Sequence, residues 1–242
     1  MKASPSDQQQ ILDVAAFDQK TTALNHIAAT LPEIAELASV TTKSNNARDL
    51  RIAAETELND VKRELLRAEG DVEQIVTRIV RDEARLSGGS ASPKELEQLQ
   101  HEVGTLNARR AELEEVELEI MMRVDEIKAR ISDLQSQEAG HSELINELNI
   151  RMENALARIN GELESLAKER SETLAAVSPE LIALYEKIRA SNNGTGAAAL
   201  VAGACTGCHL SINTVELKRV AELAQDEVVR CEECRCILVR GA

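Results

Sequence analysis

The sequence predicts a mostly α-helical protein: a long antiparallel coiled-coil hairpin, followed by a small C-terminal domain of short strands and one helix. Three observations predict this fold class. Aromatic residues make up 1 % of the 242 residues and charged residues 29 %, a balance typical of long helices rather than of a large globular core. Apolar residues recur at alternating steps of three and four along the helical part. Four cysteines form two Cys-x-x-Cys pairs near the C-terminus.

The first arm of the hairpin is predicted in two pieces. A helix from about Asp7 to Thr30 is interrupted near residues 30–32, which include a proline, and then resumes. From Leu50 onwards a seven-residue apolar repeat predicts the a/d seam of a left-handed coiled coil, in which only Asp82 fits poorly. The predicted seam residues are Leu50, Ala54, Leu58, Val61, Leu65, Ala68, Val72, Ile75, Ile79 and Leu86.

The tip of the hairpin is predicted near residues 87–93, Ser-Gly-Gly-Ser-Ala-Ser-Pro. Glycines end a helix readily, and serine followed by proline is a common start for the next one. The return helix, from Pro93 to about Val177, spans on the order of 125 Å at about 1.5 Å per residue. The first arm nearly matches that length once the N-terminal helix is included. The matched arms and the glycine hinge favour a hairpin over the alternative, a parallel homodimeric rod.

The chain is predicted to divide into a helical coiled-coil hairpin at residues 1–190 and a ribbon domain at residues 191–242. Ser178 and the proline after it interrupt the return helix, and a shorter amphipathic helix follows. Residues 191–196, rich in Asn and Gly, predict a flexible turn or linker between the two domains.

The ribbon domain is predicted to contain short strands and one helix. Residues 197–202 are small and apolar, and residues 237–239 resemble a closing strand. Between them, Asn213 with Glu216 three residues later forms the pattern of a capping box, which predicts the start of a helix.

Two Cys-x-x-Cys pairs, Cys205 with Cys208 and Cys231 with Cys234, lie 22 residues apart. Each pair places two thiolates on one turn, and Zn²⁺ prefers four such ligands in a tetrahedron. A domain this small also needs a staple to fold. The sequence therefore predicts one structural Zn²⁺ held by Cys205, Cys208, Cys231 and Cys234. Four thiolates leave no open coordination position, so a hydrolytic centre is not expected.

Other interpretations of the cysteines are weaker. The run from Cys205 to His209 also matches the attachment motif of c-type haem, but that chemistry requires export and leaves the second pair unexplained. Thiol–disulfide redox centres lack the surrounding alternation of strands and helices. The fifth cysteine, Cys236, is predicted to pack beside the site, with a spare metal ligand or an oxidant-exposed thiol as the alternative. His209 is expected to support the fold or face solvent.

Composition and charge exclude several classes of function. The net charge of −14 repels phosphate backbones and anionic membranes. The chain has no run of 18 apolar residues, so no membrane span is expected. It also begins without an apolar signal core, which predicts a cytoplasmic location. It carries no phosphate-binding glycine loop, nucleophile elbow or metalloprotease motif, so an enzyme is not predicted.

The order of these parts resembles a bacterial family of coiled-coil proteins that end in a C4-type zinc ribbon, which includes the flagellar regulator FlgZ. The resemblance rests on the run from Ser92 to Glu102 and on the tail, which comprises Leu184–Arg189, Cys205-x-Gly207-Cys208-His209, and Cys231-x-x-Cys234 followed by Ile237-Leu238. It implies a helical hairpin with a zinc ribbon at its open end, whose ligands are the four paired cysteines. Members are described as nucleic-acid-binding, and some are linked to an alternative sigma factor and to flagellar messages. This chain departs from the family at Arg235-Cys236, where the family tends to have Gly-Arg.

Two functions remain open. The first is a non-enzymatic scaffold or adaptor that binds a partner protein, with a transcription-related partner suggested by the resemblance. The alternative is nucleic-acid binding through the ribbon, although residues 191–242 hold five Lys or Arg against six Asp or Glu. They also lack aromatic side chains on which bases stack. A local cationic patch stays open as a hypothesis for Lys218, Arg219, Arg230, Arg235 and Arg240. A redox-sensing switch is a distant third.

Overall fold

The computed structural model describes residues 1–89 and 92–241. Its contacts divide the chain into two units, each of which is described by itself. The hairpin unit comprises residues 36–148, and the ribbon unit comprises Met1–Ala35 with Asn149–Ala242. Helix α2 (Pro32–Ser87) and helix α3 (Pro93–Leu174) contribute to both units. Helix α1 (Pro5–Ala29), helix α4 (Pro179–Ser191) and the C-terminal strands belong to the ribbon unit.

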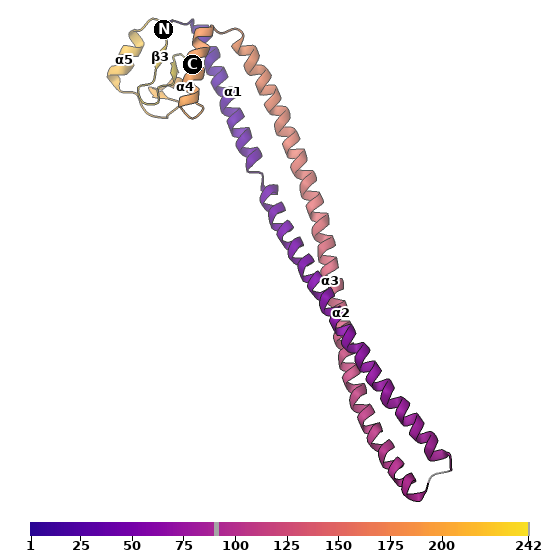
Figure 1. The fold of residues 1–242 in the computed structure, drawn as a ribbon. Helices are drawn as coiled ribbons and strands as arrows, with labels where there is room; N and C mark the ends of the chain where they lie inside the picture. The colour runs from indigo at the N-terminus through magenta and orange to yellow at the C-terminus, as the bar shows by residue number, and fades with distance from the viewer. Residues whose placement is uncertain (90–91, 242) are drawn as a thin grey trace. The chain divides into compact units, whose positions relative to one another are not determined.

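In the hairpin unit α2 and α3 run antiparallel, as the sequence predicts, and the parallel homodimeric rod is not the fold of this chain (Figure 1). The start of α3 follows the predicted cap. Ser92 accepts a hydrogen bond on its Oγ from the Glu95 amide, while Glu95 accepts from the Ser92 amide at 2.8 Å. This reciprocal pair is a capping box. The predicted tip at 87–93 includes residues 90 and 91, which lie outside the described residues.

The seam of the hairpin unit differs from the prediction at Leu50, which is 60 % exposed. The predicted seam residues Ala54 and Val61 are buried, and the same seven-residue spacing continues towards the start of α2 through the buried Ala47 and Val40. Arg51 occupies the seam position next to Leu50, where its half-buried guanidinium bonds Glu138 of α3 at 2.6 Å. The seam at this turn therefore contains the ion pair of Arg51 and Glu138 and not an apolar residue. The facing α3 residues that are buried include Ile120, Val124, Ile127, Ile131 and Leu134.

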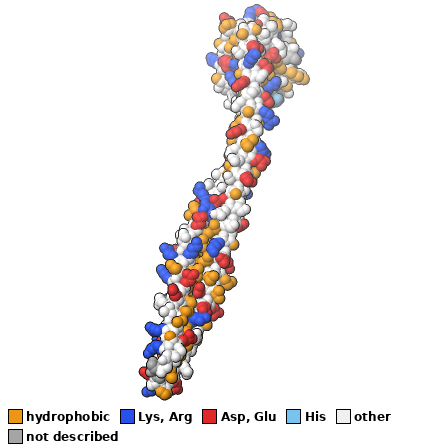
Figure 2. Space-filling model, turned by 90° about the vertical axis from the view of Figure 1, so that its right-hand side faces the viewer, with side chains coloured by type: hydrophobic (Ala, Val, Ile, Leu, Met, Phe, Trp, Pro, Cys, Tyr) orange, Lys and Arg blue, Asp and Glu red, His pale blue; other side chains and the backbone are white. Residues whose placement is uncertain are grey.

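Asp82 is buried in the seam, at the position that the apolar repeat assigns to it. Three arginines of its own helix surround the carboxylate, with nitrogen to oxygen distances of 3.6–4.0 Å. These cations offset part of the cost of burying a charge. On the surface of this unit, side chains of both signs are interspersed, with apolar side chains showing between them (Figure 2).

The ribbon unit packs α1 and α4 against a four-stranded sheet in the order β2-β1-β4-β3. Strand β1 (Ala197–Val201) runs parallel to β4 (Ile237–Val239), whereas β2 (Ala204–Cys205) and β3 (Val229–Arg230) pair antiparallel at the two sides. Helix α5 (Thr214–Glu222) connects β2 to β3. The buried core joins residues of all these parts, among them Ile11, Val14, Leu181, Tyr185, Val220, Ile237 and Leu238.

The predicted flexible turn or linker at residues 191–196 forms a turn, and its last residue, Gly196, is packed against the core. Asn192 donates a side-chain hydrogen bond to the Thr195 carbonyl, and the Gly196 carbonyl accepts from the amide of Ile237 in β4. A Cβ at Gly196 would lie only 2.4 Å from the Tyr185 ring. Glycine is therefore required here by close packing on α4, not by flexibility.

The first residues of the chain add a short extension to the ribbon that the sequence analysis did not predict. The Ala3 amide donates to the Asp226 carbonyl, and the Val228 amide donates to the Met1 carbonyl. Gln8, buried at the start of α1, bonds the carbonyls of Ala3 and Gln225. Such backbone pairing gives no periodic signal in sequence, because it joins segments more than 200 residues apart. Across the described residues, no helix combines the length and apolar character that a membrane crossing needs.

Candidate metal centre

The structure brings the four predicted ligands together at one end of the sheet. The Sγ atoms of Cys205, Cys208, Cys231 and Cys234 all lie within 4.8 Å of one another. Two of the separations are 3.8 Å, from Cys205 to Cys234, and 3.9 Å, from Cys208 to Cys231. Sulfurs bound to one tetrahedral Zn²⁺ lie about 3.8 Å apart, because each Zn–S bond is about 2.3 Å. The thiol set therefore fits a zinc ion in number, chemistry and spacing.

The two Cys-x-x-Cys turns have the same backbone design. In the first, the His209 amide donates to the Cys205 carbonyl, and the Cys205 amide donates to the Leu210 carbonyl. In the second, the Arg235 amide donates to the Cys231 carbonyl, and the Cys231 amide donates to the Cys236 carbonyl. The residue after each second cysteine has a positive φ, 59° at His209 and 61° at Arg235. Each turn thus presents its two sulfurs on the same side.

The environment of the thiols is shaped by burial. Cys205 and Cys231 are buried, whereas Cys208 and Cys234 are half-buried. Burial raises the pKa of the Cys234 thiol to about 12 and that of Cys236 further still. Neither thiol ionises on its own near neutral pH, so a cation is needed to make them thiolates. The exposed His209 side chain is not part of the sulfur cluster.

Two protein-family models match this chain. The CT398-like coiled coil hairpin domain matches residues 14–193, and a C4-type zinc ribbon domain matches residues 204–238. The chain belongs to the CT398-like coiled-coil hairpin family.

Relatives of this CT398-like protein match over almost their whole length. An uncharacterised protein of Mycobacterium tuberculosis is 34 % identical and covers 99 % of this chain and 98 % of its own. A Mycobacterium smegmatis structure shares 30 % identity with a TM-score of 0.85, covering 99 % of this chain and 100 % of the other. CT398 of Chlamydia trachomatis shares the fold, at 21 % identity, a TM-score of 0.68 and 97 % coverage of both chains.

The basic residues proposed as a patch on the ribbon are mostly used inside it. The Arg240 guanidinium donates to four backbone carbonyls at and just beyond the C-terminal end of α5, at 2.7–3.0 Å. The Val220 carbonyl lies in the last turn of α5, where carbonyls lack an amide partner within the helix, so Arg240 acts as a cap. Arg219 pairs with both oxygens of the buried Glu216, which lowers the pKa of that carboxyl. Arg230 donates to the Arg235 carbonyl.

Helix α5 begins at the predicted position with half of the predicted capping box. Asn213 accepts a hydrogen bond from the Glu216 amide at 2.8 Å. The Glu216 side chain pairs with Arg219 rather than returning to the Asn213 amide. The reason is charge: a guanidinium is a stronger partner for a buried carboxylate than a backbone amide.

A buried charge cluster beside the ribbon was missed by the sequence analysis. Asp18 of α1, only 3 % exposed, accepts from Arg170 at 2.8 Å and from the Tyr185 hydroxyl at 2.6 Å. Arg189 of α4 forms an ion pair with it at 3.0 Å. Burial and the neighbouring carboxylate raise the pKa of Tyr185 above its usual value. Asp18 is followed in the sequence by four polar residues, so no local pattern marks it as a buried charge.

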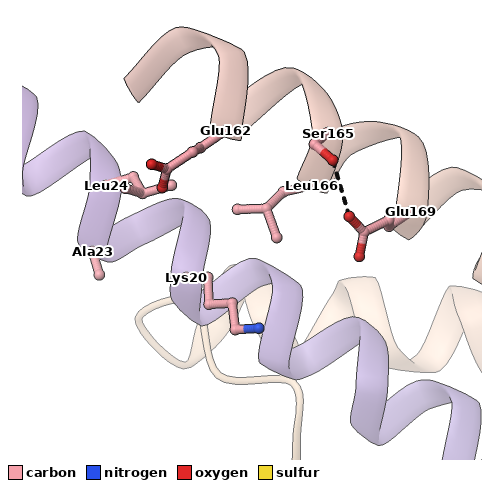
Figure 3. A pocket seen from close by; sticks show the side chains of 7 residues that line it. All are labelled: Lys20, Ala23, Leu24, Glu162, Ser165, Leu166 and Glu169. Carbon is pink, nitrogen blue, oxygen red and sulfur yellow. Dashed lines mark hydrogen bonds between the residues drawn. The ribbon is translucent and has the colours of Figure 1, made fainter. Parts of the chain in front are cut away.

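A groove of about 420 Å³ lies between α1 and α3 in the ribbon unit. Leu166 of α3 points from its helix into the space towards α1, where Leu24 also lies, and Lys20, Glu162 and Glu169 border it (Figure 3). Ser165 donates a hydrogen bond to Glu169 along α3. The groove is an open gap between two helices with charged borders, and its polar groups do not converge on one point as they do in small-molecule sites.

Proposed function

We propose that this chain is a cytosolic, non-enzymatic adaptor whose zinc ribbon, together with the neighbouring α4, binds a partner protein in regulation. One structural Zn²⁺ at Cys205, Cys208, Cys231 and Cys234 fixes the ribbon. The spacing of the four sulfurs supports the ion, and the closed ligand set assigns it a structural role. The resemblance to the flagellar regulator and its transcription-linked relatives suggests a transcription-related partner.

The main support for the proposal is that most Lys and Arg side chains of the ribbon domain are already bonded within the protein. Phosphate binding requires clustered cations that are available to the ligand. Arg240 donates to backbone carbonyls at the end of α5, and Arg219 pairs with Glu216. Arg230 donates to a backbone carbonyl. Of the five Lys and Arg residues in the described range 191–241, Lys218 and Arg235 are the two whose side chains make no such bond. A zinc ion with four thiolates adds about two further negative charges. These features favour a protein partner over a nucleic acid.

Exposed apolar side chains on the ribbon support the same conclusion. Val215 in the first turn of α5 is 77 % exposed, and Leu210 after the first cysteine turn is 51 % exposed. Leu210 lines a hollow of about 100 Å³ together with Glu232 and Glu233 of the second turn. Apolar groups with acidic neighbours suit a partner surface that combines apolar and basic side chains.

The test is affinity capture of the tagged chain from its native cytosol, with and without nuclease, followed by identification of bound protein and nucleic acid. We expect a stoichiometric protein partner that survives nuclease and is lost with Val215→Asp. An acidic residue is favourable in the first turn of a helix, so this change leaves α5 intact. Met122→Asp, at a position of α3 in the hairpin unit that is 66 % exposed, is the matched control. RNA or DNA retained at physiological salt would support the nucleic-acid alternative instead.

A further inference from the structure

Cys236 places a fifth thiol beside the cluster of four sulfurs. Its Sγ lies 3.1 Å from the Sγ of Cys234 and 3.7 Å from that of Cys205, and the residue is completely buried. Gly207 lies next to this thiol, since a Cβ at that position would be in ordinary van der Waals contact with the Cys236 sulfur, at 3.5 Å. The position of Cys236 beside the site is thus as the sequence predicts. The sulfur separations, however, point to more than packing.

These separations distinguish compatible from incompatible ligand pairs. The 3.7 Å from Cys236 to Cys205 equals the spacing between ligands of one zinc, about 3.8 Å. The 3.1 Å from Cys236 to Cys234 is too short for two thiolates bound to the same tetrahedral ion. Cys236 is therefore compatible with Cys205 as a second ligand of one zinc ion, but it is not compatible with Cys234.

The supporting structure also favours exchange at Cys234 rather than at Cys205. Cys205 is buried in β2, where it is in register with Leu200 of β1. Cys234 is half-buried and lies in the turn between β3 and β4, outside both strands. Cys236 immediately precedes β4, so its backbone is already held close to the site.

We infer that Cys236 is an alternative zinc ligand that replaces Cys234. This inference rests on the proposed zinc site. In the exchange the bond from zinc to the Cys234 sulfur breaks, and a bond to the Cys236 sulfur forms. The proton released by the Cys236 thiol is taken up by the Cys234 thiolate, so the charge of the centre and its proton count are unchanged. No oxidant or reductant is required. The reserve ligand keeps zinc bound when the half-exposed Cys234 is chemically modified.

The test compares zinc content and affinity in full-length Cys234→Ala, Cys236→Ala, Cys231→Ala and the Cys234→Ala/Cys236→Ala double variant. We expect Cys234→Ala and Cys236→Ala each to retain one zinc, with an affinity within about tenfold of the unmodified chain. The double variant and Cys231→Ala should weaken binding by more than about 100-fold, beyond the effect of an outer-shell change. Cobalt-loaded Cys234→Ala should show the absorption of a four-thiolate tetrahedral ion.

Two results separate failure of the inference from failure of the site. The inference alone is overturned if the unmodified chain binds zinc but Cys234→Ala loses it to the same extent as the double variant. An unmodified chain that binds no zinc overturns the site and the inference together.

A second measurement avoids any dependence on how the variants fold. The zinc-loaded unmodified chain is treated with limiting iodoacetamide, and the singly alkylated chain is examined by native mass spectrometry. We expect the chain alkylated at Cys234 to retain its zinc, because Cys236 takes the vacated position. Loss of zinc upon alkylation of Cys234 contradicts the inference.

Discussion

Arg235 and His209 hold backbone conformations that ordinarily favour glycine, with φ values of 61° and 59°. Both follow the second cysteine of a pair, where the chain must turn back so that both sulfurs face the same side. For a residue with a side chain, this left-handed conformation costs about 1–2 kcal/mol. Arg235 therefore carries backbone strain that a glycine at the same position would not carry.

Replacing Arg235 by glycine should therefore stabilise the second cysteine turn by about 0.5–1 kcal/mol, since relief of strain exceeds the added freedom of the unfolded chain. Slower hydrogen exchange of the amides between Cys231 and Cys236 in the zinc-loaded chain would show this. Arg230→Gly, in extended strand β3, is the control and should accelerate exchange. Faster exchange in Arg235→Gly would contradict the strain assigned to this turn.

Gly196 provides a prediction about packing. A methyl group at this position would overlap the buried Tyr185 ring, and overpacking of this kind costs about 1–3 kcal/mol. Gly196→Ala should lower the thermal unfolding midpoint of the ribbon unit. Gly161→Ala is the matched control, because that glycine lies within α3 with open space around it. It should instead raise stability by about 0.5–1 kcal/mol. Equal effects of the two changes would show that Tyr185 does not confine Gly196.

At the scale of elements, α1 and α4 are joined by the buried carboxylate of Asp18. Asp18→Asn removes the charge that balances Arg170 and Arg189. Breaking a fully buried pair costs about 3–5 kcal/mol. Because the two guanidinium groups keep some contact with water, we expect about 2–4 kcal/mol here. Hydrogen-exchange mass spectrometry of α4 peptides would measure the loss, and Tyr185→Phe, which removes one hydroxyl, should cost less. Unchanged protection of α4 in Asp18→Asn would refute this role.

The sequence predicts the elements that are determined by neighbouring residues, and it fails where contacts between distant segments decide. The helix break before Pro32, the cap at Ser92 and the strand at Ile237 follow from local residue patterns, and the structure contains all of them. The prediction is wrong at Leu50, because apolar periodicity alone does not show that the polar Arg51 takes the seam position at this turn. The partner of Arg51, Glu138, lies 87 residues away in the sequence.

The candidate site was predictable for the same reason that the cap was: two cysteines on one turn form a local motif. The partners of Cys236, the capping of α5 by Arg240 and the cluster around Asp18 were not predictable. Each joins segments that are distant in sequence, and each involves residue types that are common on helix surfaces. Burial is what gives these residues their roles, and a single sequence does not report it.

In the whole molecule, the zinc ribbon shares its hydrophobic core with helices α1 and α4. Its core includes Ile11 and Val14 of α1 and Leu181 and Tyr185 of α4. Because metal binding contributes directly to the folding of small zinc domains, chelation should loosen this entire core. We expect faster hydrogen exchange in α1 and α4 as well as in the strands, with residues 36–148 unaffected. Changes confined to residues 197–241 would show that the helices do not depend on the metal.

Native mass spectrometry of the full-length chain, purified without added metal, is the decisive test of the zinc site. Four thiols whose spacing matches a tetrahedral ion predict a mass increase of one Zn²⁺ per chain, lost on chelation and restored by zinc. A folded ribbon with intact, reduced thiols and no bound metal would contradict the account.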